Sequence, residues 1–179
     1  IDVSRYAMIY AGAQKNMGPA GVAVVIVSDA FLDQAPAKTH PLLDYRLHAE
    51  NGSMYNTPPC WSIYMCGLVY KYLIEQGGLT AAAGRNAAKA KAIYDAMDNS
   101  GGFFKGHAVK ENRSHMNLTF TLPTDELTST FLAQAKEQRL LELKGHRSVG
   151  GCRASIYNAF PQEGCDLLAQ FMHSFALQT

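Results

Sequence analysis

The chain has 179 residues, of which 47% are hydrophobic and 17% are charged, and its formal net charge at pH 7 is +1. This composition predicts one medium or two small folded domains and excludes an intrinsically disordered chain. No apolar run is long enough for a membrane span, and the balanced charge offers no general attraction for nucleic acid. We therefore expect neither a membrane nor a nucleic-acid partner, and any anion binding must be local.

Two apolar runs near the N-terminus predict a pair of β-strands. The first covers residues 6–12, and the second covers residues 22–27, which are apolar and mostly β-branched and so are expected to be buried on both faces. Because the connection is short, we expect the two strands to be antiparallel neighbours. A strand this close to Ile1, in a chain without an initiating methionine, suggests a fragment of a larger domain.

The loop between these runs carries one lysine among glycines. The segment reads Tyr10-Ala11-Gly12-Ala13-Gln14-Lys15-Asn16-Met17-Gly18-Pro19-Ala20-Gly21. Lysine shifts its pKa readily when it is desolvated, so Lys15 can serve as a Schiff-base nucleophile. The alternative is an ordinary solvated loop lysine. For the catalytic reading we expect a half-dehydrated amine at the mouth of a cleft.

Residues 28–76 are expected to form an irregular segment followed by a helix. Residues 28–56 contain Pro36, Pro41, Asn51 and Gly52 and are expected to be irregular. A helix is then predicted over 57–76, because proline suits a first helical turn and a Gly-Gly pair ends the pattern. Its broad apolar face indicates burial, either in a core or at a subunit interface. Asn56 and Thr57 precede this helix and are either an anion-binding site or an ordinary helix cap.

From residue 79 onward the pattern is that of a small α+β domain. We expect a helix over 81–97, a half-buried strand over 115–122, and a helix capped by Thr124 that ends near residue 138. Short strands are expected at 141–143 and 153–158, before a final helix that begins at Pro161. The predicted buried stripe of that helix is Leu167, Leu168, Phe171 and Phe175. We therefore place two domains at 1–78 and 79–179.

A second basic, glycine-rich segment lies near the C-terminus. It reads Lys144-Gly145-His146-Arg147-Ser148-Val149-Gly150-Gly151-Cys152-Arg153. Glycines let the backbone approach a ligand closely, and a guanidinium binds a carboxylate through two parallel hydrogen bonds. Arg153 begins a strand and suits a carboxylate, while His146 and Arg147 suit a phosphate. The alternative is that these side chains are exposed loop charges.

Cysteine and histidine spacing argues against a metal site. Cys60, Cys66, Cys152 and Cys165 form no CxxC pair, and the histidines show no metal-ligand spacing. We expect reduced, buried thiols and no bound metal.

Three segments together carry a family resemblance. They are Ile9-Tyr10-Ala11-Gly12-Ala13-Gln14-Lys15-Asn16, Asn51-Gly52-Ser53-Met54-Tyr55-Asn56-Thr57-Pro58-Pro59 and residues 144–159, which begin with the basic loop. In these motifs, and in their order along essentially the whole chain, the sequence resembles the phosphoserine aminotransferase family. Members of this family are pyridoxal-phosphate enzymes of the fold-type I group.

The resemblance implies an α/β fold. This chain would be the C-terminal part of a fold-type I PLP-transferase large domain followed by a small α+β domain, within a homodimer. The implied reaction converts 3-phosphohydroxypyruvate and glutamate to phosphoserine and 2-oxoglutarate, a step of serine biosynthesis. The implied cofactor is pyridoxal 5'-phosphate.

The resemblance also assigns residues to the cofactor. Lys15 matches the catalytic lysine that binds the cofactor covalently and shuttles protons. Gln14 matches a contact to the cofactor phosphate. Asn56 and Thr57 match a pair that reaches across the dimer to the cofactor phosphate of the neighbouring subunit.

On the substrate side, Arg153 matches the clamp for the α-carboxylate. His146 and Arg147 match part of the substrate-phosphate site. The residues alone had indicated one amine nucleophile and two separate anion sites. Phosphoserine carries both a carboxylate and a phosphate, so the resemblance agrees with that reading.

Members of the family continue well upstream of Ile1. The upstream half holds the aspartate that faces the pyridine nitrogen, the aromatic residue stacked on the ring and most of the phosphate cup. We therefore expect these 179 residues to be inactive without the upstream half of the same protein. Two alternatives stay open: a related aminotransferase with another substrate, and a non-catalytic dimerisation module. The expected location is the cytoplasm, or a plastid or mitochondrion if an upstream transit peptide was lost.

Overall fold

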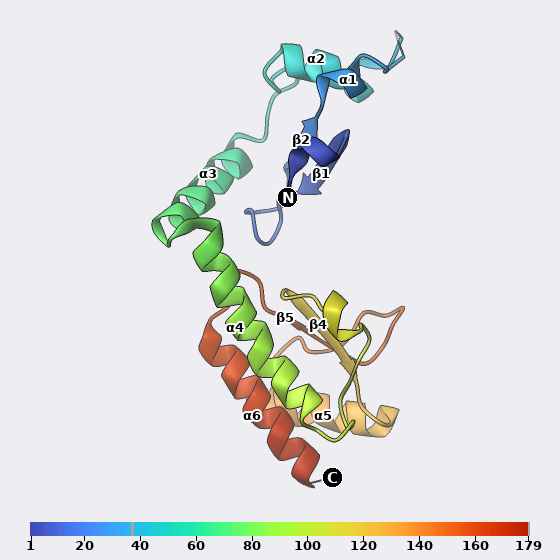
Figure 1. The fold of residues 1–179 in the computed structure, drawn as a ribbon, viewed down its shortest axis with the longest axis vertical. Helices are drawn as coiled ribbons and strands as arrows, with labels where there is room; N and C mark the ends of the chain where they lie inside the picture. The colour runs from blue at the N-terminus through green and yellow to red at the C-terminus, as the bar shows by residue number, and fades with distance from the viewer. Residues whose placement is uncertain (37, 179) are drawn as a thin grey trace. The chain divides into compact units, whose positions relative to one another are not determined.

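The computed structural model describes residues 1–36 and 38–178, and it shows a chain of mixed helices and strands (Figure 1). The chain separates into two compact units, Ile1–Tyr72 and Leu73–Thr179. This division lies six residues before the domain boundary predicted at 78/79. The predicted domain boundary itself stays a prediction. No helix in the described part of the chain is long and apolar enough to cross a bilayer.

The N-terminal unit is built on a two-stranded hairpin. A 3-10 turn, η1 (Val3–Arg5), precedes β1 (Met8–Gly12), which pairs antiparallel with β2 (Ala23–Val27). The antiparallel pairing is confirmed. The expected burial of β2 on both faces is wrong for this chain, because all of its residues are exposed or half-buried and Ile26 is 48% exposed. A lone hairpin has no second layer to cover its faces.

The prediction that residues 28–56 are irregular is also wrong. They contain α1 (Asp29–Leu32), η2 (Pro41–Leu43) and α2 (Tyr45–Glu50). The residue directly before each short helix is an N-cap whose side chain accepts a backbone N–H from the first turn. These residues are Ser28, His40 and Asp44. Such caps stabilise a single helical turn, even where prolines and glycines lie nearby.

Helix α3 (Cys60–Glu75) confirms the helix predicted over 57–76, and it starts directly after Pro59. The predicted burial of its apolar face is not found in this chain. Only Ser62 and Cys66 are buried, whereas Trp61 is 65% exposed and Tyr64 is 64% exposed. The apolar face of α3 is therefore not covered by core residues of this unit.

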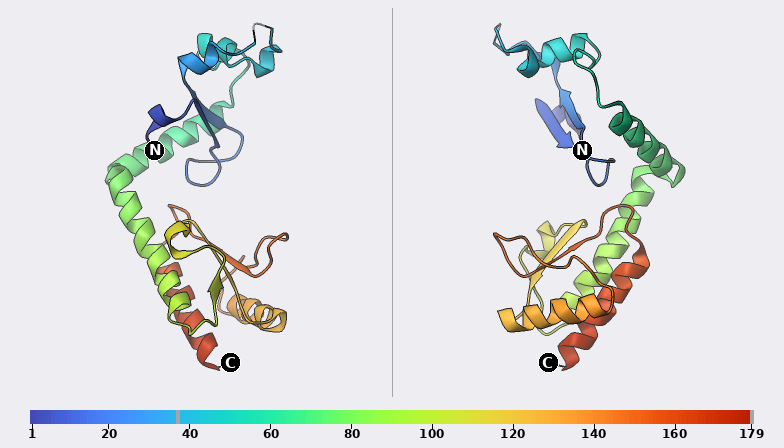
Figure 2. Two further views of the ribbon diagram at one scale, coloured as in Figure 1. Left: turned by 45° about the vertical axis from the view of Figure 1, so that its right-hand side comes forward. Right: turned by 180° about the vertical axis from the view of Figure 1, so that it is seen from behind.

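The C-terminal unit is a two-layer α+β structure. Its sheet has the order β3-β4-β5, with every pair antiparallel. The views of Figure 2 agree that α4 and α6 lie side by side next to this sheet. The elements in chain order are α4 (Gly78–Asp98), β3 (Lys105–Gly106), η3 (Lys110–Asn112), β4 (Asn117–Thr121), α5 (Asp125–Glu137), β5 (Cys152–Ser155) and α6 (Gln162–Gln178).

The alternation predicted for two of these strands is confirmed. Leu118 and Phe120 on β4 are fully buried, as are Cys152 and Ala154 on β5 to within 2%. Because side chains of a strand alternate between faces, these four residues share one face of the sheet. The helices α4, α5 and α6 contribute most of the remaining core residues, and Phe104, Leu122, Leu143 and Ile156 come from the segments between elements.

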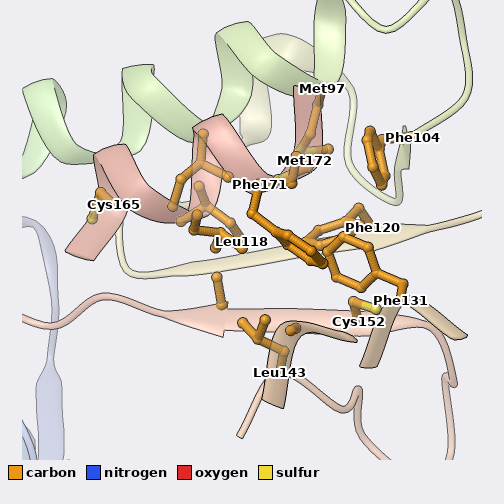
Figure 3. Packing of buried hydrophobic residues seen from close by; sticks show 14 of the residues in the cluster. Met97, Phe104, Leu118, Phe120, Phe131, Leu143, Cys152, Cys165, Phe171 and Met172 are labelled. Atoms are coloured by element: carbon orange, nitrogen blue, oxygen red, sulfur yellow. The ribbon is translucent and has the colours of Figure 1, made fainter. Parts of the chain in front are cut away.

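The centre of this core is aromatic (Figure 3). Phe131 of α5 meets Phe120 at a ring separation of 5.9 Å and Phe104 at 5.7 Å, in edge-to-face arrangements. Phe171 and Phe175 of α6 pack on the same ring at 4.9 Å and 5.2 Å. Such aromatic pairs favour edge-to-face contacts. They fix α5 and α6 against β4.

Two details of the C-terminal unit differ from prediction. Residues 141–143 do not form a strand, and only an isolated bridge joins Lys144 to Cys152. The reason is backbone geometry, because Arg139 and Glu142 have φ values of 64° and 59°, which interrupt an extended chain. The two-residue strand β3 was not predicted.

One of the four residues predicted to be buried on α6 is exposed. Leu168, Phe171 and Phe175 are buried as expected, but Leu167 is 57% exposed. The buried residues of α6 are Cys165, Leu168, Phe171, Met172 and Phe175. Successive helical residues are about 100° apart, and Leu167 lies just beyond the edge of this stripe.

Candidate functional site

The Lys15 loop is a tight, internally bonded turn between β1 and β2. The backbone N–H of Lys15 donates to the carbonyl oxygen of Gly18 at 3.0 Å, and that of Met17 donates to Ala13 at 3.2 Å. Lys15 itself has a φ of 92°, in the left-handed region that a side chain rarely adopts. A non-glycine residue held in such a conformation is often part of a functional site.

This loop is seated on helix α3. A Cβ added to Gly18 would lie 2.7 Å from Cys66 Sγ, so a larger residue here would displace the Cys66 thiol. Ser62 Oγ donates to the carbonyl oxygen of Ala20 at 3.1 Å. Because Ser62 and Cys66 are one helical turn apart, one buried face of α3 supports residues 18–21 of the lysine loop.

Lys15 and Gln14 both have exposed side chains in this chain. The expectation of a half-dehydrated lysine amine is therefore not met within these 179 residues. The chain folds the backbone that presents Lys15, but it supplies too few surrounding groups to remove water from the amine. The Gln14 side chain lies over Gly12, where any Cβ would overlap it.

Asn56 and Thr57 lie in the N-terminal unit in the short non-helical segment before α3, and both are exposed. Cys60 N–H donates to the carbonyl oxygen of Pro58 at 2.8 Å. The amide and hydroxyl of Asn56 and Thr57 thus stand beside a helix N-terminus, a setting that suits a phosphate.

The basic loop of the C-terminal unit depends on two close backbone approaches. Gly145 N–H donates to the Gly151 carbonyl oxygen at 2.8 Å, and a Cβ on Gly145 would overlap the carbonyl of Gly150. Gly151 has a φ of 61°, and a Cβ there would lie 2.6 Å from the carbonyl oxygen of Phe120. Larger residues at these two positions would push the loop off the end of β5.

His146 and Arg147 occupy the tip of this loop, and both are exposed. The backbone N–H of Ser148 donates to His146 Nδ1 at 3.3 Å, and the Ser148 hydroxyl lies 2.7 Å from the same nitrogen. Because Nδ1 accepts a hydrogen bond, the neutral imidazole carries its proton on Nε2. The loop therefore offers an N–H donor and a guanidinium to an anion.

Arg153 lies on β5 opposite Thr119 of β4 and is half-buried. Its Nε atom is buried and has no hydrogen-bond partner among the described residues. A buried donor without an acceptor is costly, so this nitrogen favours an incoming anion. Arg153 is the predicted site residue whose geometry most directly indicates a missing ligand.

An open cavity of about 610 Å³ adjoins Arg153 in the C-terminal unit. Its charged walls are Arg139, Glu142, Lys144 and Arg153, and most of its other walls are apolar, including Phe160. Three cations against one carboxylate give the cavity a positive balance. It suits an organic acid with an apolar part.

The predicted residues thus form two groups. In the N-terminal unit, Lys15 and Gln14 share one loop, and Asn56 and Thr57 lie before α3. In the C-terminal unit, the anion-binding candidates His146, Arg147 and Arg153 lie in the segment 146–153. Sequence reasoning missed Ser62 and Cys66 as supports of the lysine loop, and it missed a buried lysine, Lys89, on α4. The signal for Lys89 was present, because it lies at helical spacing among buried positions 82, 86, 90 and 93.

Comparison with known proteins agrees with the resemblance in the three motifs. A family model described as aminotransferase class-V matches residues 1–168. A phosphoserine aminotransferase of Geobacillus kaustophilus is 58% identical over 174 residues, which are 97% of this chain and 48% of that protein. The chain spans about half the length of the curated relatives it matches.

Solved structures show the same fold. The phosphoserine aminotransferase of Bacillus circulans subsp. alkalophilus aligns with a TM-score of 0.94 at 46% identity, over 99% of this chain and 49% of that chain. A phosphoserine aminotransferase from Trichomonas vaginalis with bound PLP aligns with a TM-score of 0.88 at 39% identity, over 96% of this chain and 49% of that one. The predicted fold class is confirmed.

Proposed function

Because the chain belongs to the class-V aminotransferase family, we propose that it is the C-terminal half of a PLP-dependent phosphoserine aminotransferase. The full-length protein would transfer the amino group of glutamate to 3-phosphohydroxypyruvate, giving phosphoserine and 2-oxoglutarate. The observation that carries this proposal is Lys15, held with a φ of 92° in a loop seated on α3. Relatives named phosphoserine aminotransferase support the choice of substrate.

Four residues of the N-terminal unit would hold the cofactor. Lys15 would bind it covalently through its amine and move a proton to and from the substrate Cα. The side chain of Gln14 would donate to its phosphate. Asn56 and Thr57, beside a helix N-terminus, would reach across a homodimer and donate to the cofactor phosphate of the neighbouring subunit. When bound, pyridoxal phosphate supplies an electron sink for the carbanion. The donor set fits this group, since it consists of one exposed amine and neutral hydrogen-bond donors.

Three residues of the C-terminal unit would hold the substrate. Arg153 would bind the α-carboxylate, since its buried Nε has no other partner among the described residues. His146 and Arg147 would bind the substrate phosphate at the tip of the basic loop. A bound dianion on one side and a carboxylate on the other would orient the Cα of the substrate.

The remaining half of the full-length protein would complete the site. It is the part of the relatives' length that this chain does not span. We propose that it covers the amine of Lys15, excludes water from it and supplies the partner of the pyridine nitrogen. The isolated 179-residue chain would therefore not transaminate.

A non-catalytic dimerisation module is the second candidate, and the exposed face of α3 is the observation that agrees with it. Trp61, Tyr64, Leu68 and Tyr72 follow helical spacing, and all are at least 40% exposed. A contiguous apolar patch of this kind marks an interface. In the enzyme reading the same face packs on the second copy of a homodimer, so the face by itself supports both candidates.

The four free cysteines bear on the location. Unpaired thiols are typical of a reducing compartment. They support the cytoplasm, or the interior of a plastid or mitochondrion, as the place where the full-length protein acts.

Lys15→Ala tests the enzyme proposal in the full-length protein. We expect purified wild-type protein to retain cofactor that borohydride fixes covalently, seen as a mass increase on the peptide that contains residue 15. The variant should show no such increase and should lose activity by a factor of about 10⁴ or more, because the amine is both the attachment point and the base. A dimer without fixable cofactor in the wild type would favour the module instead.

Arg147→Ala tests the substrate phosphate. We expect kcat/KM for phosphoserine to fall roughly 100-fold, because a charge-assisted bidentate contact is lost. The same constant for glutamate, which lacks a phosphate, should change less than about threefold. If both substrates lose activity equally, the protein is an aminotransferase with another substrate.

A further inference from the structure

Lys89 of α4 is a buried amine that the proposed reaction does not use. Its side chain is 3% exposed. The Nζ atom lies within hydrogen-bond range of four carbonyl oxygens, those of Tyr157 at 2.7 Å, Phe160 at 3.1 Å, Ile156 at 3.2 Å and Asn158 at 3.5 Å. An ammonium has three N–H donors, so these are shared among the four acceptors.

The carbonyl groups replace a carboxylate partner for this amine. Burial lowers the pKa of Lys89, the neighbouring Cys165 raises it and Arg85 lowers it again. Burial also raises the pKa of the Cys165 thiol to about 11, so that neighbour is neutral at pH 7. A buried charge needs compensation, and here the described acceptors are all backbone oxygens of one turn. The side chain is therefore a clamp on residues 156–160.

A second contact from α4 grips the same turn. Asn86 Nδ2 donates to Asn158 Oδ1 at 2.7 Å, and Asn86 is 6% exposed. Asn86 and Lys89 are three residues apart, so both lie on one face of the helix. Two side chains of a rigid helix thus hold a turn that lies about 70 residues further along the chain.

This turn directly follows the strand that carries Arg153. The backbone N–H of Ile156 donates to the carbonyl oxygen of Met116 at 2.9 Å, so the end of β5 is also tied to β4. Phe160, whose carbonyl Lys89 binds, lines the cavity next to Arg153. A shift of the turn would move both the strand end and that cavity wall.

We propose that Lys89 is a positioning residue, which fixes the turn 156–160 and thereby the direction in which Arg153 presents its guanidinium to a substrate carboxylate. This inference rests on the proposed role of Arg153 as the carboxylate clamp. It assigns a functional consequence to a buried lysine that would otherwise only stabilise the fold. Lys89 acts through Arg153 and does not touch the substrate.

The test compares Lys89→Met with Lys91→Met in the full-length protein. Methionine keeps the length and packing of the side chain and removes the donors. Lys91 lies two residues on along the same helix, is exposed, and pairs with Asp95, so its variant is a matched control. The measurements are the equilibrium dissociation constant of glutamate, its KM and kcat, and the thermal midpoint of unfolding.

We expect Lys89→Met to weaken glutamate binding and raise its KM roughly tenfold, since small displacements of a positioned group are costly. Lys91→Met should leave these constants within about twofold, as expected for an exposed pair. A double-mutant cycle with Arg153→Ala separates positioning from general destabilisation. In the Arg153→Ala background, Lys89→Met should cause no further loss of glutamate affinity, because the two residues act as one unit.

Three results would count against the inference. Unchanged glutamate affinity in Lys89→Met, with a lowered thermal midpoint, would show a purely structural lysine. An equal loss in the Arg153→Ala background would show an effect that does not pass through Arg153. Unchanged affinity in Arg153→Ala alone would instead refute the proposed carboxylate clamp, and this inference with it.

Two further variants keep the test decisive if Lys89→Met does not fold. Lys89→Arg retains charge and donors and should restore most of the glutamate affinity. Asn86→Ala removes only the contact to Asn158 and should raise the glutamate dissociation constant roughly two- to threefold. Wild-type affinity in Asn86→Ala together with tenfold weaker binding in Lys89→Arg would overturn the clamp as described.

Discussion

Asp98, at the end of α4, shows how single charges hold the C-terminal unit together. Arg113 donates to both carboxylate oxygens, at 2.8 Å and 2.9 Å, and Lys110 Nζ lies 3.0 Å from Oδ2. The guanidinium also stacks over the ring of Tyr94, 4.6 Å from its centroid. The hydrogen bonds from Arg113 are the largest cause that lowers the pKa of Asp98, to about 2.

Asp98→Asn should therefore destabilise the protein in a pH-dependent way. The folded pKa of about 2 is below the ordinary value of 3.8, so the unfolded state binds more protons between these values. The stabilisation is present above about pH 4 and is lost as the pH falls toward 2. Because the pair is partly exposed, we expect about 1 kcal/mol at pH 7. Urea unfolding of wild type and variant at several pH values measures it.

The control for this prediction is Asp95→Asn on the same helix. Asp95 pairs with Lys91 on the exposed surface, so its loss should cost less than about 0.5 kcal/mol at any pH. A gap between wild type and Asp98→Asn that stays constant from pH 7 to pH 2 would contradict the ion-pair explanation.

Lys15 shows that a residue and its sequence neighbours do not determine how much water reaches its side chain. The glycine-rich sequence indicated an unusual loop conformation. In the structure Lys15 has a positive φ, and Gly18 of the same loop packs against Cys66 of α3. The predicted dehydration of the amine was not found, since the side chain is exposed. Dehydration depends on atoms packed around the amine from other parts of the molecule, which local sequence does not specify.

At the scale of elements, α6 gives a direct comparison between neighbouring residues. Leu168 is 4% exposed within the aromatic core, whereas Leu167 is 57% exposed. We expect Leu168→Ala to lower the free energy of unfolding by about 2–4 kcal/mol, through lost burial and the cavity left behind. Leu167→Ala should cost less than about 1 kcal/mol. Urea unfolding of the two variants of this chain measures both values.

Equal costs for these two leucines would mean that the face of α6 is assigned incorrectly. The periodic pattern alone had placed both in the buried stripe. Helical geometry separates them, because the two residues are about 100° apart around the helix and Leu167 lies beyond the edge of the buried stripe.

Strand β2 and helix α3 illustrate a different failure at the element scale. Both are strongly apolar, and the prediction of burial followed from that composition. In this chain Ile26 is 48% exposed and Ile74 is 72% exposed. The secondary structure was predicted correctly because it depends on local pattern, whereas burial needs partners that lie elsewhere.

At the scale of the whole molecule, the two units differ in how they are stabilised. Among its described residues, the C-terminal unit has a core of 18 buried hydrophobic residues from its sheet, its helices and the segments between them. In the N-terminal unit, the buried residues among those described are Ala13, Ser62 and Cys66. Apolar burial is the main favourable term in folding, so the N-terminal unit depends on further partner surface. The remaining half of the full-length protein and a second copy are the partners we propose.

The sequence by itself determined the main strands and longer helices, and the family. The alternation of β4, the Thr124 cap of α5 and the glycine pair after α3 are local patterns, and each appears where it was predicted. The motifs around Lys15 and Arg153 led to a fold class that solved structures confirm. Such features depend on residues a few positions apart, whose geometry the backbone fixes directly.

Only the tertiary structure decided which distant residues meet. Lys89 binds carbonyl groups 67–71 residues away, and Gly18 meets Cys66 across 48 positions. The same is true of the exposed faces of β2 and α3, whose apolar residues were expected to be covered. The physical reason is that desolvation and hydrogen bonding to a distant turn exist only after the chain has returned on itself.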